Sequence, residues 1–167
     1  IDETAILEIS EVLRSGKIAQ GPRVLELEEK FANFCGVKYC AAVNSGTAAL
    51  HSALYAAGIK SGDEVITTPF SFLATVNSIL MLGAKPVFVD IDSRTFNLDT
   101  QQLRKAITSR TKAILPVHLF GMMTPMTEIM NFASEYNLIV IEDAAQAHGS
   151  QYIGKMAGTF GMLGAFS

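Results

Sequence analysis

The sequence has few cysteines and no recognisable metal site. Its only two cysteines, Cys35 and Cys40, lie close together, and His118 and His148 are far from both along the chain. No set of histidines and cysteines has the spacing of metal ligands. Since disulfides are rare in the cytosol, this usage predicts two reduced thiols, no bound metal and a cytoplasmic location.

Long apolar runs and blocks of like charge are also missing. The apolar stretches fall far short of the about 20 residues that a helix needs to cross a bilayer, and no signal-peptide pattern opens the chain. The 13 basic and 16 acidic residues, with a formal net charge of −3, are spread along all 167 residues. This distribution argues against nucleic-acid and membrane partners. The hydrophobic content of 49% is enough to bury a substantial core.

Strand and helix signals alternate along the chain. Helices are expected at 4–15, 22–36, 47–57, 72–82, 100–107 and 126–136, and strands at 39–44, 64–68, 86–90, 112–117 and 138–142. In the second helix, Leu27, Phe31 and Phe34 are expected to face inward. The glycine-rich residues 149–164 are expected to form a loop with a short hairpin around 152–156. The pattern predicts a three-layer α/β fold with a mainly parallel central sheet and helices on both faces.

The most informative stretch is the apolar run 138–141, which ends in Glu142 and Asp143. Such a run is typical of a strand buried on both faces of a parallel sheet. A carboxylate at the end of that strand is unfavourable unless it has a partner, and ligands bind at the carboxyl ends of such strands. Asp143 is therefore either a structural cap or the counter-ion of a cationic group. The small residues between Asp143 and Gln146 leave room for a ligand.

A second strand end carries Ser45, Gly46, Thr47 and Ala48 before a predicted helix. Glycine permits close approach of the backbone to a ligand, and the free N–H groups of a helix start favour phosphate. An ordinary helix cap by Ser45 or Thr47 is the alternative. The segment is not a P-loop, because no Gly-Lys-Ser/Thr follows, and it lacks two glycines of the dinucleotide fingerprint.

A third strand end is followed by Pro69, Phe70 and Phe72. An aromatic side chain here could stack on a planar ring, and packing in the core is the alternative for each of the two. A phosphate cradle, an aromatic shelf and a buried carboxylate on one edge describe a flat, phosphorylated, cationic heteroaromatic ligand. Pyridoxal phosphate (PLP) fits this description, because its ring nitrogen stays protonated only if a carboxylate faces it.

In their order along the chain, these motifs resemble the DegT/DnrJ/EryC1/StrS family of PLP-dependent, fold-type I sugar aminotransferases. The likeness runs from about residue 14 to the last residue. It is carried by Gly16 to Pro22, Ser45 to Leu50, Gly62 to Ile66, Val87 to Asp92, Pro116 to His118, Glu142 to Gly149 and Gly164 to Ser167.

The resemblance implies a phosphate site made by two separate segments. The backbone of Gly46, Thr47 and Ala48 would hold the cofactor phosphate at the helix N-terminus. Ser167 would give its hydroxyl to the same phosphate. These residues occupy the matching positions of the family's motifs.

The resemblance also implies a site for the cofactor ring. Phe72 would stack on the pyridine ring, Asp143 would pair with the ring nitrogen, and Gln146 would contact the ring hydroxyl. For His118 and His148, hydrogen-bonded structural roles near the site are favoured over catalysis.

The lysine that forms the Schiff base in this family follows the equivalent serine closely. We therefore expect it beyond Ser167, with no catalytic residue inside the chain. The chain begins at Ile1 without a methionine and stops after a glycine-rich stretch. We expect residues 1–167 to be an N-terminal segment plus most of the PLP-binding large domain of a longer protein, without its C-terminal small domain.

The resemblance implies a homodimeric transferase that moves an amino group from an amino-acid donor, expected to be glutamate, to a keto group of a nucleotide-linked sugar. Two alternatives remain open. One is a PLP-dependent sugar 3-dehydratase, in which histidine replaces the lysine. The other is a non-catalytic remnant that binds PLP without turnover, because a fragment that lacks the lysine is expected to be inactive.

Overall fold

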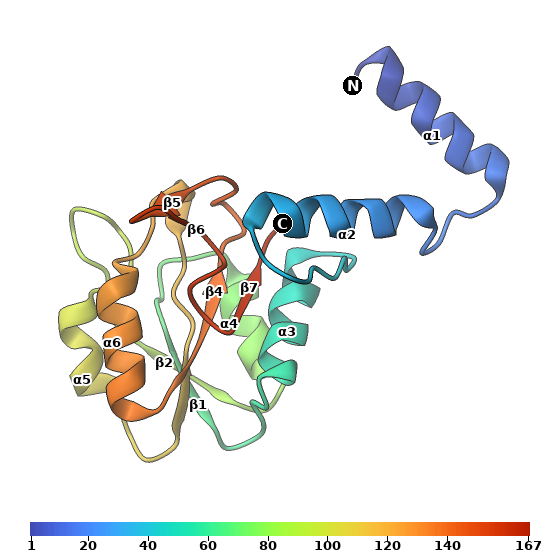
Figure 1. Cartoon of the computed structure of the whole chain (residues 1–167). Coiled ribbons are helices and arrows are strands. Elements are labelled where there is room, and N and C mark those ends of the chain that lie inside the picture. The colour runs from blue at the N-terminus through green and yellow to red at the C-terminus, as the bar shows by residue number, and fades with distance from the viewer. The chain divides into compact units, whose positions relative to one another are not determined.

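Two capped helices make up the unit Ile1–Ala42 in the computed structural model, which describes residues 1–167. They are α1 (Glu3–Ser15) and α2 (Pro22–Cys35), close to the predicted bounds (Figure 1). Asp2 begins α1 by accepting the N–H of Ala5 at 2.8 Å. Gly16, with a φ of 70°, ends it in the left-handed conformation that glycine adopts without strain.

The predicted inward face of α2 is only partly correct. Phe31 is half-buried, but Leu27 and Phe34 are each 54% exposed. Only Ala32 and Cys35 of this helix are buried. The prediction is wrong for Leu27 and Phe34, because apolar spacing on a helix does not by itself supply a surface to cover those side chains.

A five-stranded sheet with only parallel pairs forms the centre of the unit Val43–Ser167. Its order is β2-β1-β3-β4-β7. The strands are β1 (Glu64–Thr67), β2 (Lys85–Phe88), β3 (Thr111–Ile114), β4 (Ile139–Asp143) and β7 (Leu163–Ala165). The chain runs from β1 outward to β2 and then returns to place β3 on the other side of β1. The order therefore reverses between β1 and β3, where ligands bind in open α/β sheets.

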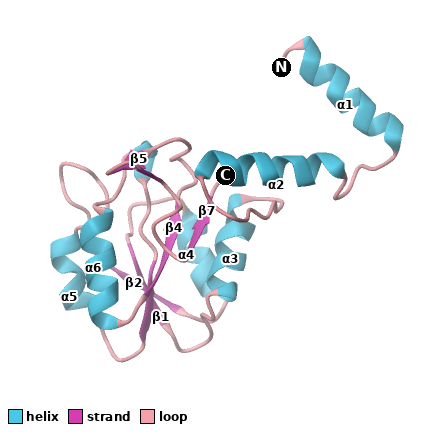
Figure 2. Ribbon diagram, viewed as in Figure 1, coloured by secondary structure: helices cyan, strands magenta, loops and turns pink.

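Helices cover both faces of this sheet, as predicted (Figures 1 and 2). One face carries α3 (Gly46–Ala56) and α4 (Leu73–Leu80), and the other carries α5 (Leu103–Ala106) and α6 (Met126–Tyr136). Neighbouring residues of β1 point to opposite faces, so Val65 packs in one core with Leu54 of α3. Ile66 packs in the other core with Ile129 of α6. None of the helices combines the length and the apolar composition of a membrane-spanning segment.

The strand predicted at 39–44 is wrong. These residues form no regular element, and the N–H of Ala42 donates to the carboxylate of Glu28 at 2.8 Å instead of to a neighbouring strand. A run of β-favouring residues forms a strand only where a partner strand lies beside it.

The glycine-rich tail contains both an expected hairpin and an unexpected strand. The hairpin of β5 (Gln151–Tyr152) and β6 (Lys155–Met156) is confirmed. Sequence reasoning missed β7, because glycine is uncommon inside strands. The glycines are needed for close packing: a Cβ on Gly161 would lie 2.3 Å from the carbonyl oxygen of Val140, and one on Gly164 would lie 2.3 Å from that of Gly158.

Candidate functional site

Asp143 ends β4 as a buried carboxylate without a cationic partner. Its side chain is 4% exposed, and none of the ion pairs in the structure includes it. Thr75 donates to its Oδ2 at 2.7 Å, and the N–H of Ala145 donates to its Oδ1 at 3.3 Å. Burial raises the pKa of Asp143, and these two hydrogen bonds oppose that rise. A bound cation would stabilise the ionised form.

These hydrogen bonds help to decide whether Asp143 is a structural cap or the counter-ion of a cationic group. A cap would accept short hydrogen bonds from the backbone, but the single such bond, from Ala145, is long. A buried carboxylate that lacks a counter-charge is what a protonated ring nitrogen requires. The residues therefore fit a cationic ring better than a purely structural cap.

The start of α3 lies against the last residue of the chain. A Cβ on Gly46 would lie 2.6 Å from the Cβ and 2.9 Å from the Oγ of Ser167, so only glycine lets these segments approach. Ser45 is the helix cap, since its Oγ accepts the N–H of Ala48 at 3.1 Å. The N–H groups of Gly46 and Thr47 precede the first intrahelical donors. The structure thus brings Gly46, Thr47 and Ser167 together, while Ala48 already has an acceptor.

Phe72 is held at the same edge of the sheet with its ring in solvent. It occupies the cap position of α4, three residues before Thr75, and is 77% exposed. Core packing, the alternative considered for this residue, does not occur. Phe70 instead packs against Phe96, with ring centroids 5.9 Å apart. Of the two predicted aromatic candidates, Phe72 is the one whose ring has an open face.

Gln146 is exposed and contacts the short 3₁₀ helix η2 (Leu119–Gly121). Its Oε1 accepts the N–H of Phe120 at 2.9 Å. Because that N–H requires an acceptor, the amide oxygen faces Phe120 and the Nε2 donors face away from it. These donors match the predicted contact to a ring hydroxyl.

The turn that contains Phe120 is braced by two further side chains that sequence reasoning missed. Phe120 has a φ of 53°, which is uncommon for a bulky residue. Asn97, 1% exposed, accepts the N–H of Leu119 at 3.1 Å and donates to the carbonyl of Met122 at 2.8 Å. Ser150 donates to the carbonyl of Gly121 at 2.7 Å. Together with Gln146, these bonds hold the turn in place. No local sequence motif predicts the roles of Asn97 and Ser150, because each of their hydrogen bonds joins segments that are distant along the chain.

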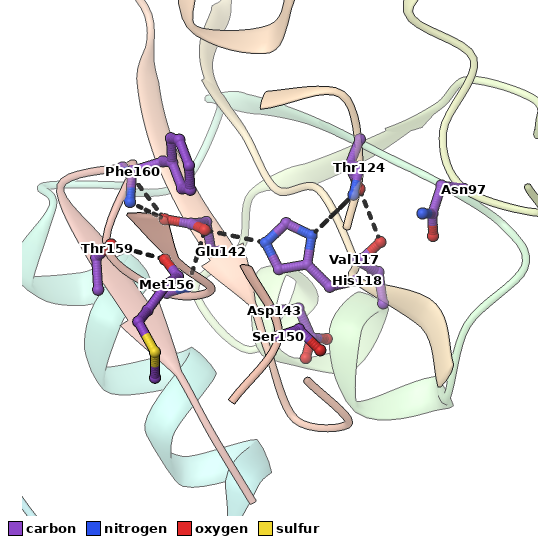
Figure 3. A network of polar contacts seen from close by, with 12 residues as sticks. Asn97, Val117, His118, Thr124, Glu142, Asp143, Ser150, Met156, Thr159 and Phe160 are labelled. Atoms are coloured by element: carbon purple, nitrogen blue, oxygen red, sulfur yellow. Dashed lines mark hydrogen bonds and ion pairs between the residues drawn. The ribbon is translucent and has the colours of Figure 1, made fainter. Parts of the chain in front are cut away.

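His118 has the structural role that the sequence predicted. Its ring is completely buried between Glu142 and Thr124 (Figure 3). The N–H of Thr124 donates to Nδ1 at 3.2 Å, so Nδ1 is an acceptor and the ring hydrogen is on Nε2. That hydrogen is donated to Glu142 Oε2 at 2.9 Å. His118 is therefore neutral and fully hydrogen-bonded. His148 is exposed, and its ring centroid lies 5.2 Å from that of Phe166.

Glu142 organises the glycine-rich loop, a role that sequence reasoning also missed. Its carboxylate accepts the N–H groups of Gly158, Phe160 and Gly161 at 2.9, 2.6 and 2.7 Å (Figure 3 shows the bond to Phe160). This loop leads directly into β7 and Ser167. Successive strand residues point to opposite faces, so Glu142 and its neighbour Asp143 serve different surroundings. The alternation of side chains between the two faces of a strand is the sequence signal that could have predicted different roles for Glu142 and Asp143.

Comparison with known proteins agrees with this geometry. The sequence matches the profile of the DegT/DnrJ/EryC1/StrS aminotransferase family over residues 1–167. The UDP-2-acetamido-2-deoxy-3-oxo-D-glucuronate aminotransferase of Pseudomonas aeruginosa is 52% identical over 147 residues, which are 88% of this chain and 41% of that protein. This chain spans about two fifths of the length of the curated relatives that it matches.

Solved structures share the same architecture. The aminotransferase from Psychrobacter cryohalolentis superposes with a TM-score of 0.97 at 40% identity, over 100% of this chain and 43% of that chain. NtdA from Bacillus subtilis, solved with the bound cofactor PMP, has a TM-score of 0.88 at 40% identity, over 95% of this chain and 37% of that chain. The predicted fold class is confirmed, and a cofactor of the predicted class is present in a similar structure.

Proposed function

Because the chain belongs to the DegT/DnrJ/EryC1/StrS aminotransferase family, we propose that it forms the cofactor-binding part of a PLP-dependent aminotransferase acting on a nucleotide-linked keto-sugar. The observation that carries the proposal is the buried carboxylate of Asp143, which lies at the carboxyl edge of the sheet and takes part in none of the ion pairs. PMP, the amine form of the cofactor, is bound in NtdA. When bound, PLP supplies an electron sink for the carbon that exchanges its amino group.

The phosphate of the cofactor would be held at the start of α3. The N–H groups of Gly46 and Thr47 and the hydroxyl of Ser167 are the donors proposed for it. The N–H of Ala48 already donates to the Oγ of Ser45. Ala48 would therefore contribute only to the positive end of the helix dipole at the phosphate, not a hydrogen bond of its own. The close contact of Gly46 with Ser167 supports this part of the proposal.

The ring would be held between three side chains. Asp143 would keep the ring nitrogen protonated, Phe72 would stack on the ring, and Gln146 would donate from Nε2 to the ring hydroxyl. The exposed ring of Phe72 and the orientation of the Gln146 amide support these roles.

The whole protein is proposed to supply what this part does not contain. The Schiff-base lysine is proposed to lie beyond Ser167, together with the small domain, so that residues 1–167 are an N-terminal segment and most of the large domain. We keep glutamate as the proposed donor and a homodimer as the proposed assembly. The half-exposed apolar side chains of α2, Leu27 and Phe34, are a surface of the kind that a partner covers. The two unpaired thiols, Cys35 and Cys40, support a cytoplasmic location.

The sugar 3-dehydratase alternative is not favoured, because the relative compared above is named as an aminotransferase. The alternative of a non-catalytic remnant that binds PLP without turnover is tested by an activity assay. Full-length protein is loaded with PLP and mixed with glutamate, and the absorbance change from the PLP to the PMP form is followed. A UDP-linked 3-keto sugar is then added, and the aminated product is measured by mass spectrometry.

The expected result is both half-reactions in the wild type and a rate lower by on the order of a hundredfold in Asp143→Asn. Asp2→Asn is the matched control, because Asp2 is exposed and asparagine retains its capping function. A wild-type protein that gives no change with any amino donor would favour the remnant. Unchanged rates in Asp143→Asn would refute the proposed role of that carboxylate.

A further inference from the structure

Thr75 is a completely buried residue of α4 whose hydroxyl reaches Asp143 on β4. Its Oγ1 lies 2.7 Å from Oδ2 of Asp143. On its other side, the same oxygen lies 2.8 Å from the Oγ of Ser71. No sequence motif singled out Thr75 or Ser71, and neither has a part in the proposed function so far.

The hydrogen-bonding capacity of the three groups sets the direction of this chain. An ionised carboxylate only accepts, and a hydroxyl has a single hydrogen to donate. Thr75 must therefore donate to Asp143, and its oxygen accepts from Ser71. A short hydrogen bond to an ionised acceptor is stronger than one between neutral groups.

Thr75 is the main group that orients the carboxylate. The other hydrogen bond to Asp143, from the N–H of Ala145 to Oδ1, is 3.3 Å long and correspondingly weak. Oδ1 retains capacity for a further donor, whereas Oδ2 is tied to the hydroxyl. Loss of the Thr75 hydroxyl would leave the carboxylate without its shortest hydrogen bond in a buried place.

No charged side chain replaces this contact. His118 donates to Glu142, and Glu142 itself is bound to the glycine-rich loop. The only hydrogen bond that α4 makes with the Asp143 carboxylate comes from the hydroxyl of Thr75, and Asp143 forms no ion pair. Burial raises the pKa of Asp143, and the hydrogen bond from Thr75 is the largest effect that opposes it.

We propose that Thr75 is a positioning residue that keeps Asp143 ionised and oriented for the ring nitrogen of the cofactor, with Ser71 polarising the Thr75 hydroxyl. This inference rests on the proposed function, because it assigns the carboxylate to that nitrogen. Its local part, the control of the charge of Asp143 by Thr75, is measurable without any cofactor.

The first experiment follows the Asp143 carboxyl by ¹³C NMR during a pH titration of cofactor-free full-length protein. The signal is assigned by its absence in Asp143→Asn. Thr75→Val removes the donor with little change of shape, and Thr75→Ser is the control that retains it. We expect Thr75→Val to raise the proton affinity of Asp143 by roughly tenfold, and Thr75→Ser to leave it near the wild type. Equal titration of all three proteins would overturn the inference.

The second experiment measures PMP affinity by fluorescence titration at neutral pH, since PMP binds without a Schiff base. We expect Thr75→Val to bind PMP roughly five- to tenfold more weakly, and Thr75→Ser to bind it normally. If Asp143→Asn binds PMP as well as the wild type, the proposed function itself fails. If Asp143→Asn weakens binding but Thr75→Val does not, only the inference about Thr75 fails.

Ser71→Ala provides an independent variant, because Ser71 is only partly buried and its removal leaves the core intact. Circular dichroism establishes whether each variant is folded. We expect Ser71→Ala to shift the Asp143 titration in the same direction as Thr75→Val, by roughly two- to threefold, because Thr75 loses its own donor. A shift in the opposite direction, or none, would contradict the hydroxyl chain even if Thr75→Val failed to fold.

Discussion

His118 donates its Nε2 hydrogen to Glu142 across 2.9 Å, in a place where neither side chain is exposed. The pair joins the segment after β3 to β4 as a hydrogen bond between a neutral ring and a carboxylate. Glu142 also accepts three N–H groups of the loop before β7. The carboxylate that holds His118 therefore also sets the path by which Ser167 reaches Gly46. A network without a catalytic part thus shapes the proposed phosphate site.

Removal of the Glu142 carboxylate should destabilise the fold strongly. Glu142→Ala leaves three partly buried backbone donors and the buried Nε2 hydrogen of His118 without an acceptor. We expect the free energy of unfolding to fall by on the order of 3 kcal/mol. Urea denaturation followed by circular dichroism measures this change. Glu135→Ala is the matched control, because Glu135 is exposed and its pair with Arg104 should contribute less than about 1 kcal/mol. Equal losses in the two variants would contradict the anchoring role.

Gly46→Ala should push Ser167 away from the start of α3. The new Cβ would lie 2.6 Å from that of Ser167, which is too close for any unstrained packing. We expect PMP affinity to fall by roughly tenfold or more, with a smaller loss of stability. The double variant with Ser167→Gly removes the clash. It should recover stability in a thermal melt but not PMP affinity, and recovery of both would argue against a hydroxyl contact to the phosphate.

Stability in acid should depend on Glu64 at the other end of the sheet. Hydrogen bonds from Thr108 and Arg110 lower the pKa of this buried carboxyl from 4.5 to about 2. A lowered pKa in the folded state means that ionised Glu64 stabilises the fold above pH 4.5. This contribution is lost as the pH falls toward 2. Urea unfolding at several pH values should show a shallower decline in that window for Glu64→Gln. An unchanged slope would contradict the assignment.

Ionised Asp143 should destabilise the cofactor-free protein, in contrast to ionised Glu64, which stabilises it. Burial raises its pKa above the ordinary value of 3.8, so the carboxyl favours folding only while protonated, and this advantage is lost as the pH rises. We therefore expect Asp143→Asn to melt at a higher temperature than the wild type at pH 7. The difference should vanish at a pH well below 3.8. PLP should stabilise the wild type more than the variant, and a lower melting temperature for cofactor-free Asp143→Asn would contradict the uncompensated charge.

Elements with strong local signals were predicted well. The apolar run before Glu142 forms β4, and α6 spans 126–136 as its periodicity indicates. The strand expected at 39–44 does not form, and the strand β7 was not expected, because both outcomes depend on partners elsewhere in the chain. Ala42 donates to a glutamate side chain, whereas the glycines around β7 let it pack beside β4. Pairing between distant segments leaves no trace in local composition.

The order of amino acids alone shows which residue types stand at the strand ends: Gly46 at a helix start, Phe72 after a strand and Asp143 beyond an apolar run. The folded arrangement is needed to show that Thr75, 68 residues away in sequence, donates to Asp143, and that Glu142 anchors the glycine loop. This difference arises because residue type and spacing set the chemistry of each strand end. The partner of a buried polar group is chosen instead by the packing of helices on the sheet, which brings together atoms that are remote along the chain.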